Sequence, residues 1–317
     1  MVTLTTGAAR TTSTATSSTR LAVTVLAAAA LAACGGGGPA AAVRAPAVVG
    51  PPSAAALAAV QGAVAGALSR TATVSMTLSS GGALFGASAS RVDGTGTFDF
   101  AALRGALSFR PSGSRTSEPV VFTPTAVYVR PPPGGGLLPA GKSWTVADFS
   151  DPEALTSNFP RLIAQAEIVN PALTIGELLW GGSAAAPAGH ETIGGQDAAR
   201  YAVTVDLNHA ADAVTGPGRI PFSRALATEV VALGGSVDAS AKHATTTVSA
   251  WVSANGRLAR VAGTPPAAGV GTVTTNLSGF GVAVRADPPP AVQVVDILQL
   301  TPSGERENKN GGDSDGG

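Results

Sequence analysis

Cysteine is almost absent from this sequence: among 317 residues there is one, Cys34. A single cysteine cannot form a disulfide within the chain, even in a compartment that would permit one. The place of that one residue, at the end of an apolar run, is therefore informative.

Charged and aromatic residues are also scarce, at 13% and 4% of the chain, and twenty basic residues balance twenty acidic ones. Nucleic-acid binding needs clustered cations to neutralise phosphates, and the sequence has no long basic stripe, so we expect no nucleic-acid partner. Beyond the N-terminal run, no apolar stretch approaches the roughly 20 residues of a membrane-spanning helix. We therefore expect the remainder of the chain to be soluble.

Residue patterns that usually carry catalysis are missing. His190-Glu191 is not followed by a second histidine four residues on, and the chain has no Gly-x-Ser-x-Gly elbow and no Walker loop. Gly94-Thr95-Gly96-Thr97 lacks the third glycine and the helix of a dinucleotide site, and predicts turn and strand instead. Trp144, Trp180 and Trp251 suit either core packing or the lining of a pocket. The sequence thus predicts no enzyme, no cofactor and no metal site, with an anchored hydrolase as a third alternative.

The N-terminus has the layout of a lipoprotein signal. Arg10 and Arg20 supply positive charge, and the run Leu21–Ala33 suits a secretory signal but is too short to cross about 30 Å of hydrocarbon. It ends in Leu-Ala-Ala-Cys, which resembles the bacterial lipobox; the alternative is a signal peptide with an incidental cysteine. We predict that Cys34 is lipidated, becomes the first residue of the mature chain and labels with palmitate. This would anchor the protein in the bacterial cell envelope, outside the cytoplasm.

Composition divides the chain into four parts. Residues 1–33 are the predicted signal peptide, and residues 34–52, rich in Gly, Ala and Pro, are the lipidated cysteine and a flexible tether. Residues 53–302 are long enough for one domain with a real core. Residues 303–317 end in Gly-Gly-Asp-Ser-Asp-Gly-Gly and are predicted to be a disordered tail.

Periodicity in the first part of the domain predicts one helix and then strands. The stretch Ser53–Arg70 has apolar residues at helical spacing, with Ser53 as its N-cap. Strand signals follow over residues 71–78, 87–92, 94–100, 103–109, 118–123, 126–130 and 142–147.

The remainder mixes helices and strands. Helices are predicted from Asp151 to about residue 166 and over Ala172–Trp180, and a Pro/Ala/Gly loop then leads to Gly189. A hairpin over residues 190–207 and a helix with Phe222, Leu226, Val230 and Leu233 on one face come next. Further strands are predicted at residues 245–253, 258–263 and 273–284, the last with a bulge near Ser278-Gly279, and an edge strand at 292–298. This order makes the fold α+β, a large antiparallel sheet with helices on one face.

Two hairpins also resemble a known family. Gly189–Gln196 leading into Arg200–Leu207, and Trp251–Leu258, are similar to segments of LolA-like lipoproteins, and more closely to the LppX/LprAFG lipoproteins of actinobacterial envelopes. Ser253 stands where that family commonly has an acid before the turn, and the proline-rich stretches at 131–136 and 288–290 are unusual for it.

The resemblance implies a half-open β-barrel: a strongly curved antiparallel sheet with helices on its concave face and acyl chains between the two layers. It implies a carrier of lipid or lipoglycan through the envelope, with an envelope transporter as a partner. The candidate cavity residues are Leu162, Ile163, Leu173, Leu178, Leu179, Phe222, Leu226 and Val230 on the helices and Tyr201, Val203 and Val205 on the sheet. The alternative for the same residues is a filled core in an interaction or sensing lipoprotein that binds another envelope protein.

Overall fold

The computed structural model describes residues 48–79, 90–131, 138–150, 169–216, 218–233, 244–265 and 271–300. Several predictions lie outside these ranges: the signal peptide, Cys34, most of the tether, the helix from Asp151, and the tail after residue 302. Leu162 and Ile163 lie outside them as well.

Within the described ranges, twelve strands form one sheet in the order β12-β6-β5-β4-β3-β2-β1-β11-β10-β9-β8-β7. Neighbouring strands are antiparallel except β12, which pairs parallel to β6. The sheet is open, with β12 and β7 as its two edges. The strands are β1 Thr71–Leu78, β2 Val92–Asp99, β3 Arg104–Pro111, β4 Glu118–Phe122, β5 Ala126–Val129, β6 Trp144–Asp148, β7 Gly182–Ile193, β8 Gln196–Asp206, β9 Thr245–Ser253, β10 Leu258–Gly263, β11 Val273–Ser278 and β12 Val294–Asp296.

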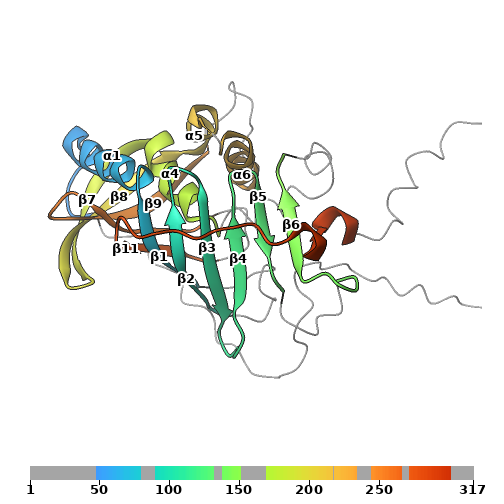
Figure 1. The fold of residues 1–317 in the computed structure, drawn as a ribbon. Helices are drawn as coiled ribbons and strands as arrows, with labels where there is room; N and C mark the ends of the chain where they lie inside the picture. The colour runs from blue at the N-terminus through green and yellow to red at the C-terminus, as the bar shows by residue number, and fades with distance from the viewer. Residues whose placement is uncertain are drawn as a thin grey trace, which may run out of the picture.

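The helices gather on one side of this sheet (Figure 1). They are α1 Ala54–Leu68, α4 Pro171–Trp180, α5 Leu207–Ala213 and α6 Arg219–Ala232, and two short 3₁₀ turns, η1 Ala291–Gln293 and η2 Ile297–Leu300, flank β12. Over the part of the chain that is described, none of the helices combines the length and apolar character needed to cross a membrane. The predicted α+β architecture, a large open and mostly antiparallel sheet with helices on one face, is confirmed.

Alternation along the strands gives the sheet an inner face, toward the helices, and an outer face. In β1 the buried residues are Ala72, Val74, Met76 and Leu78, and the residues between them are partly exposed threonines and a serine. Residues two apart in a strand share a face, so this pattern places apolar side chains on the inner face and hydroxyl groups on the outer one.

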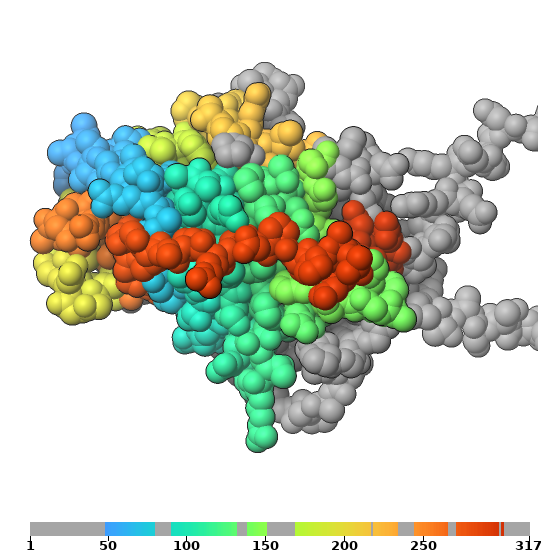
Figure 2. Space-filling model, viewed as in Figure 1, coloured from blue at the N-terminus to red at the C-terminus, as the bar shows by residue number. Residues whose placement is uncertain are grey.

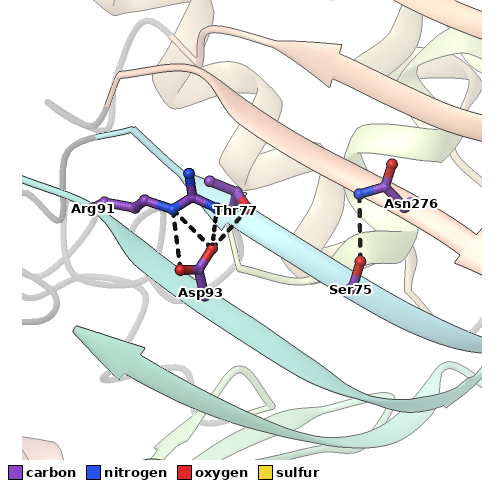
Figure 3. A network of polar contacts seen from close by, with 5 residues as sticks. All are labelled: Ser75, Thr77, Arg91, Asp93 and Asn276. Atoms are coloured by element: carbon purple, nitrogen blue, oxygen red, sulfur yellow. Dashed lines mark hydrogen bonds and ion pairs between the residues drawn. The ribbon is translucent and has the colours of Figure 1, made fainter. Parts of the chain in front are cut away.

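Figure 3 shows polar contacts of the outer face that link three strands, β1, β2 and β11, and the residue before β2. Arg91 pairs with Asp93 at 2.8 Å, and the Thr77 hydroxyl donates to the same carboxylate at 2.9 Å. Next to them, the Asn276 amide donates to Ser75 Oγ at 3.3 Å. Side-chain hydrogen bonds thus connect these strands on the outer face, while the apolar core lies on the other side.

Helix α1 has the predicted N-cap, and α4 begins with a cap of the same kind. Ser53 Oγ accepts a hydrogen bond from the Ala56 amide at 3.1 Å, and Asn170 Oδ1 accepts one from Ala172 at 3.0 Å. Both satisfy first-turn amides that have no partner inside the helix. Pro171 occupies the first turn of α4, where its missing N–H costs nothing.

The loop predicted before Gly189 is wrong, because residues 182–193 form strand β7. Apolar and polar residues do not alternate in this stretch, so pairing with other segments makes it a strand. Strand β8 lies on one side of it. On the other side, the Val49 amide donates to the Pro187 carbonyl at 2.8 Å and the Ser53 amide to the Ala185 carbonyl at 3.0 Å. The register with β8 shifts between Pro187 and His190, directly after the residue that has no N–H to donate to the ladder.

Two further predictions near strand ends are corrected. Leu207 was expected to end a strand but begins α5, because Asp206 caps that helix by accepting from the His209 amide at 3.0 Å. The predicted bulge at Ser278-Gly279 is wrong as well: β11 ends at Ser278, and Gly279, with a φ of 52°, turns the chain out of the sheet.

Residues 279–293, here called the crossing segment, then run over the outer face (Figures 1 and 2). Gly281 donates to the Thr71 carbonyl at the start of β1, and Arg104, at the start of β3, donates to the Ala286 carbonyl at 3.2 Å. The segment delivers β12 to the edge of β6, which confirms the predicted edge strand in a shorter form, Val294–Asp296. Figure 2 shows it as an orange-red band across the molecule.

Candidate functional site

The candidate site is the apolar interior, meaning the cluster of buried side chains between the inner face of the sheet and the helices. Strands β1–β5 and β7–β11 contribute to it, and so do α1, α4, α5 and α6. Because the helices form one layer over one sheet, these residues make a single continuous apolar region rather than several small ones.

The structure brings the described candidate residues together in this interior. Seven of them are at most 2% exposed: Leu173, Leu178, Val203, Val205, Phe222, Leu226 and Val230. Leu179 and Tyr201 are partly buried and pack against the same cluster. Helical spacing on α4 and α6 and alternation on β8 therefore predicted which side chains face inward; their role in binding a ligand stays a prediction.

An aromatic contact joins the two helices that carry most of these residues. Trp180, the last residue of α4, lies with its ring centroid 5.6 Å from that of Phe222 on α6, at an interplanar angle of 41°. Its indole folds back over Gly176, where an added Cβ would stand 2.4 Å from the ring. Glycine at this position therefore allows the Trp180 ring to lie flat on its own helix and reach α6.

The same layer contains buried polar groups that the sequence reasoning missed. Thr174 and Glu177 on α4 are 5% and 6% exposed, Asn170 at its N-cap is 3% exposed, and Glu229 on α6 is 2% exposed. Carboxyl groups at this depth are rare, since burial of a charge without compensation is costly.

Burial raises the pKa of Glu229 to about 8, and burial together with the nearby Glu229 carboxyl raises the pKa of Glu177 well above its ordinary value. Removal from water disfavours the ionised form of each group, and the charge of one opposes ionisation of the other. Both carboxyl groups therefore resist ionisation at a pH where an exposed glutamate is charged.

A signal for both residues was present in the sequence. Glu177 follows Leu173 by four residues, and Glu229 follows Phe222 by seven, so each lies on the apolar stripe of its helix. A carboxyl group at such a position lies on the side of the helix that packs against the interior, so the fold buries it. The apolar pattern alone could not show that the two stripes face the same interior.

The three tryptophans do not line one pocket. Trp180 faces the interior, whereas Trp251 pairs with Arg200 and Arg260 in register and lies on the outer face. The two guanidinium carbons stand 4.8 and 5.4 Å from its ring centroid, and its indole N–H donates to Glu191 at 2.9 Å. Trp251 therefore fastens β7 to β10 through cation–π and hydrogen-bond contacts. Among the described residues, no three His, Cys, Asp or Glu side chains gather in a way that could hold a metal ion.

Comparison with known proteins gives likeness in fold but little in sequence. No protein-family model matches the chain, and no curated protein sequence does either. LprF from Mycobacterium bovis is 14% identical over 76% of this chain and 100% of its own, and the Mycobacterium tuberculosis lipoprotein LppX is 14% identical over 74% and 98%, each with a TM-score of 0.40. An uncharacterized conserved protein from Thermus thermophilus is 9% identical over 75% and 96%, with a TM-score of 0.35.

LprF and LppX carry the names of the lipoprotein group that the two hairpins resemble. Their TM-scores show only a general likeness of fold, so any function has to be argued from the residues of this chain.

Proposed function

We propose that this protein is a membrane-anchored lipoprotein of the bacterial envelope that binds acyl chains in its apolar interior and carries lipid or lipoglycan through the envelope. The observation that supports this most directly is the layout of the domain: one continuous apolar region lies between a single open sheet and one layer of helices. An acyl chain needs apolar contact and no reactive group, which fits an interior built from Leu, Val, Ile, Phe and Ala.

The entry of the chain into the domain supports a tether. The Val49 and Ser53 amides bond to the edge of β7, so the described part of the chain begins at that edge of the sheet. Cys34 lies 14 residues before Val48. At roughly 3.3–3.6 Å per extended residue, a chain of this length reaches about 50 Å, enough for the domain to approach or leave the membrane surface.

The alternative is an interaction or sensing lipoprotein with a filled core. Its support is the packing of the described interior, where Leu178, Leu226 and Val230 expose none of their surface. A side chain with no accessible surface borders no space that water could occupy. At these three side chains, an acyl chain could enter under the carrier proposal only by moving a helix away from the sheet, whereas the alternative needs no such movement.

Native mass spectrometry of the full-length protein purified from its own envelope, followed by lipid extraction, tests the carrier proposal. We expect a co-purifying lipid on the folded protein and displacement of it by a fluorescent fatty acid. Val203→Phe fills the interior from the sheet side and should reduce the bound lipid several-fold, whereas Thr204→Phe, on the exposed outer side of the same strand, should not. Protein that is folded but free of lipid, and that ignores the fatty acid, would favour the filled-core alternative.

The anchor is tested separately with Cys34→Ala. Loss of the acyl chains should move the protein from the detergent phase to the aqueous phase and abolish palmitate labelling, because one residue carries all the anchoring acyl groups. A variant that still partitions with membranes and still labels contradicts the anchor, whatever the interior binds.

A further inference from the structure

The inner face of the sheet carries a buried hydroxyl group that the proposed function does not use. Thr275, the third residue of β11, exposes 0% of its surface, and its Oγ1 has no hydrogen-bond partner among the described residues. The other buried residues of β1, β10 and β11 are all apolar: Ala72, Val74, Met76, Leu78, Leu258, Val261, Val273 and Leu277. Thr275 is therefore an exception in an otherwise apolar region.

The strand register shows what lies beside this hydroxyl. Thr275 pairs with Met76 of β1 on one side and with Val261 of β10 on the other, and both of these residues are buried. Residues directly opposite each other in a sheet have their side chains on the same face, so both neighbours of the hydroxyl are apolar. The sheet itself thus supplies no side chain that could accept its proton.

Helix α1, which packs over β1, β9 and β10, supplies none either. It consists of alanine, valine, leucine and glycine with one polar side chain, Gln61, which donates to the Gly182 carbonyl at 3.4 Å. A trapped water molecule would need about two to four polar partners. The described neighbours of Thr275 are apolar, so they do not hold a water molecule there.

An unpaired hydroxyl at this depth destabilises the folded protein, since its hydration is lost and nothing replaces it. Valine has the same branched shape and the same preference for strands, and it needs no hydrogen bond. Packing alone would therefore be better served by valine at position 275. The hydroxyl is useful if its partner is a polar group that enters the interior together with a ligand.

We propose that Thr275 donates a hydrogen bond to the carbonyl oxygen of a neutral acyl ester lipid held in the interior. This inference rests on the proposed function and names the class of lipid that the interior takes. A hydroxyl group donates one hydrogen bond, and a carbonyl oxygen accepts one. The bond fixes the ester group at β11, while the acyl chain lies among the Leu, Val and Phe side chains of the interior.

The charges of the domain favour an ester over the carboxylate of a free fatty acid. No Arg, Lys or His side chain among the described residues is buried, so none balances a negative charge in the interior. Glu177 and Glu229 are already buried carboxyl groups on the helix side. A further carboxylate would lose its hydration without compensation, whereas a neutral ester does not meet this cost.

Competition binding tests the proposal on full-length protein carrying Cys34→Ala, so that no anchoring acyl chain competes for the interior. The protein would be stripped of lipid and loaded with a pyrene-labelled fatty acid methyl ester. Methyl palmitate, octadecane and palmitate, delivered from cyclodextrin at pH 8, would then displace this reporter. We expect methyl palmitate to act at about three- to tenfold lower concentration than octadecane, the effect of one buried hydrogen bond. Palmitate, which is charged, should be weaker than its ester.

Two substitutions separate the hydroxyl group from the shape of the side chain. Thr275→Val removes the donor and should bring methyl palmitate and octadecane within about twofold of each other. It should also raise the melting temperature of the lipid-free protein by about 2–4 °C, because an unpaired buried hydroxyl is lost. Thr275→Ser keeps the donor and should keep the preference for the ester. Thr274→Val makes the same change on the outer face of β11 and should alter neither property.

The possible results distinguish this inference from the carrier proposal. Wild-type protein that binds none of the probes contradicts the carrier proposal, and the role of Thr275 with it. Binding without a preference for the ester, or a preference that persists in Thr275→Val, overturns the role of Thr275 and leaves the carrier proposal standing. So does a lower melting temperature of Thr275→Val, since the hydroxyl would then already have a partner within the protein. Palmitate that competes as well as methyl palmitate would overturn the assignment of a neutral ester.

Discussion

Single glycines set the distance between strands in this sheet. In β2, a Cβ on Gly96 would stand 2.0 Å from the Ala106 carbonyl oxygen, and one on Gly94 would stand 2.5 Å from the Phe109 ring. Two glycines on the inner face thus let β3 and its aromatic side chain approach β2 closely. The motif Gly94-Thr95-Gly96-Thr97 is therefore a packing feature of a strand, which confirms the strand predicted from its missing third glycine.

Gly96→Ala should destabilise the protein strongly. The new methyl group meets backbone, which cannot rotate away, so β2 and β3 must separate, and we expect a loss of about 2–4 kcal/mol in the free energy of unfolding. Urea denaturation followed by circular dichroism measures it. A loss below about 0.5 kcal/mol would show that the two strands are not held this close.

Gly66→Ala is the opposite case and serves as its control. Gly66 lies in α1, exposed, with nothing within 4 Å of an added Cβ. Alanine restricts the unfolded chain and suits a helix, so the same measurement should show a gain of about 0.5–1 kcal/mol. Together the two substitutions separate the steric effect at Gly96 from any general effect of replacing glycine.

At the scale of elements, the crossing segment of residues 279–293 shows how a stretch without regular structure can organise a sheet. Its contacts to Thr71 and Arg104 connect the start of β1 with the start of β3, and it ends in β12 at the far edge. The Thr71 hydroxyl donates to the Val282 carbonyl at 2.7 Å, the shortest of these contacts to the segment. The segment therefore closes the outer face where no helix covers it.

Thr71→Val combined with Arg104→Ala should loosen this segment without unfolding the domain. Each lost hydrogen bond contributes about 0.5–1.5 kcal/mol, and the valine keeps the shape and strand preference of threonine. We expect limited proteolysis within residues 283–290 to accelerate several-fold while the melting temperature falls by only a few degrees. Thr95→Val, on the exposed side of β2, should leave the cleavage rate unchanged; equal cleavage rates in all three proteins would contradict the role given to these contacts.

The elements also show which parts of the fold the sequence could predict. Strands β1, β9 and β10 were predicted to the residue, because their alternation and bounding turns are local signals. The first part of β7 was not, because Gly-Ser-Ala-Ala-Ala-Pro-Ala has no alternation and becomes a strand only through pairing on both of its edges. The parallel pairing of β12 depends likewise on a segment that crosses the sheet from β11 to β6.

The candidate site, like the fold, could be predicted only in part. Periodicity found the inward-facing Leu, Val and Phe residues of α4, α6 and β8, since period and burial are linked directly. Periodicity did not predict the burial of Glu177 and Glu229 in one interior, because that depends on how two helices far apart in the sequence are placed by the fold. Their spacing marked them as inward-facing, but only the fold places their charges together.

At the scale of the whole molecule, acidic and basic residues are equal in number, but a few carboxyl groups with shifted pKa values make the stability of the fold depend on pH. Glu118, Glu177 and Glu229 all have pKa values raised by burial, the first to about 7 and the last to about 8. In the unfolded chain they ionise near pH 4.5, so above that pH the folded state binds more protons than the unfolded one. Asp93 works in the opposite sense, because its hydrogen bond to Arg91 lowers its pKa and its contribution is lost in acid.

Stability should therefore be greatest at mildly acidic pH and decline through the neutral range. Between about pH 4.5 and the raised pKa of each glutamate, every pH unit lowers the free energy of unfolding by up to about 1.4 kcal/mol per group, and by less for the half-exposed Glu118. We expect the melting temperature to fall by at least about 5 °C between pH 5.5 and 8.5, measured by differential scanning calorimetry in buffers of equal ionic strength. The Glu177→Gln, Glu229→Gln double variant should flatten most of this decline, leaving the smaller part due to Glu118. A wild-type protein whose melting temperature stays constant or rises over that range would mean that these carboxyl groups keep ordinary pKa values, and hence that water reaches the layer between α4 and α6.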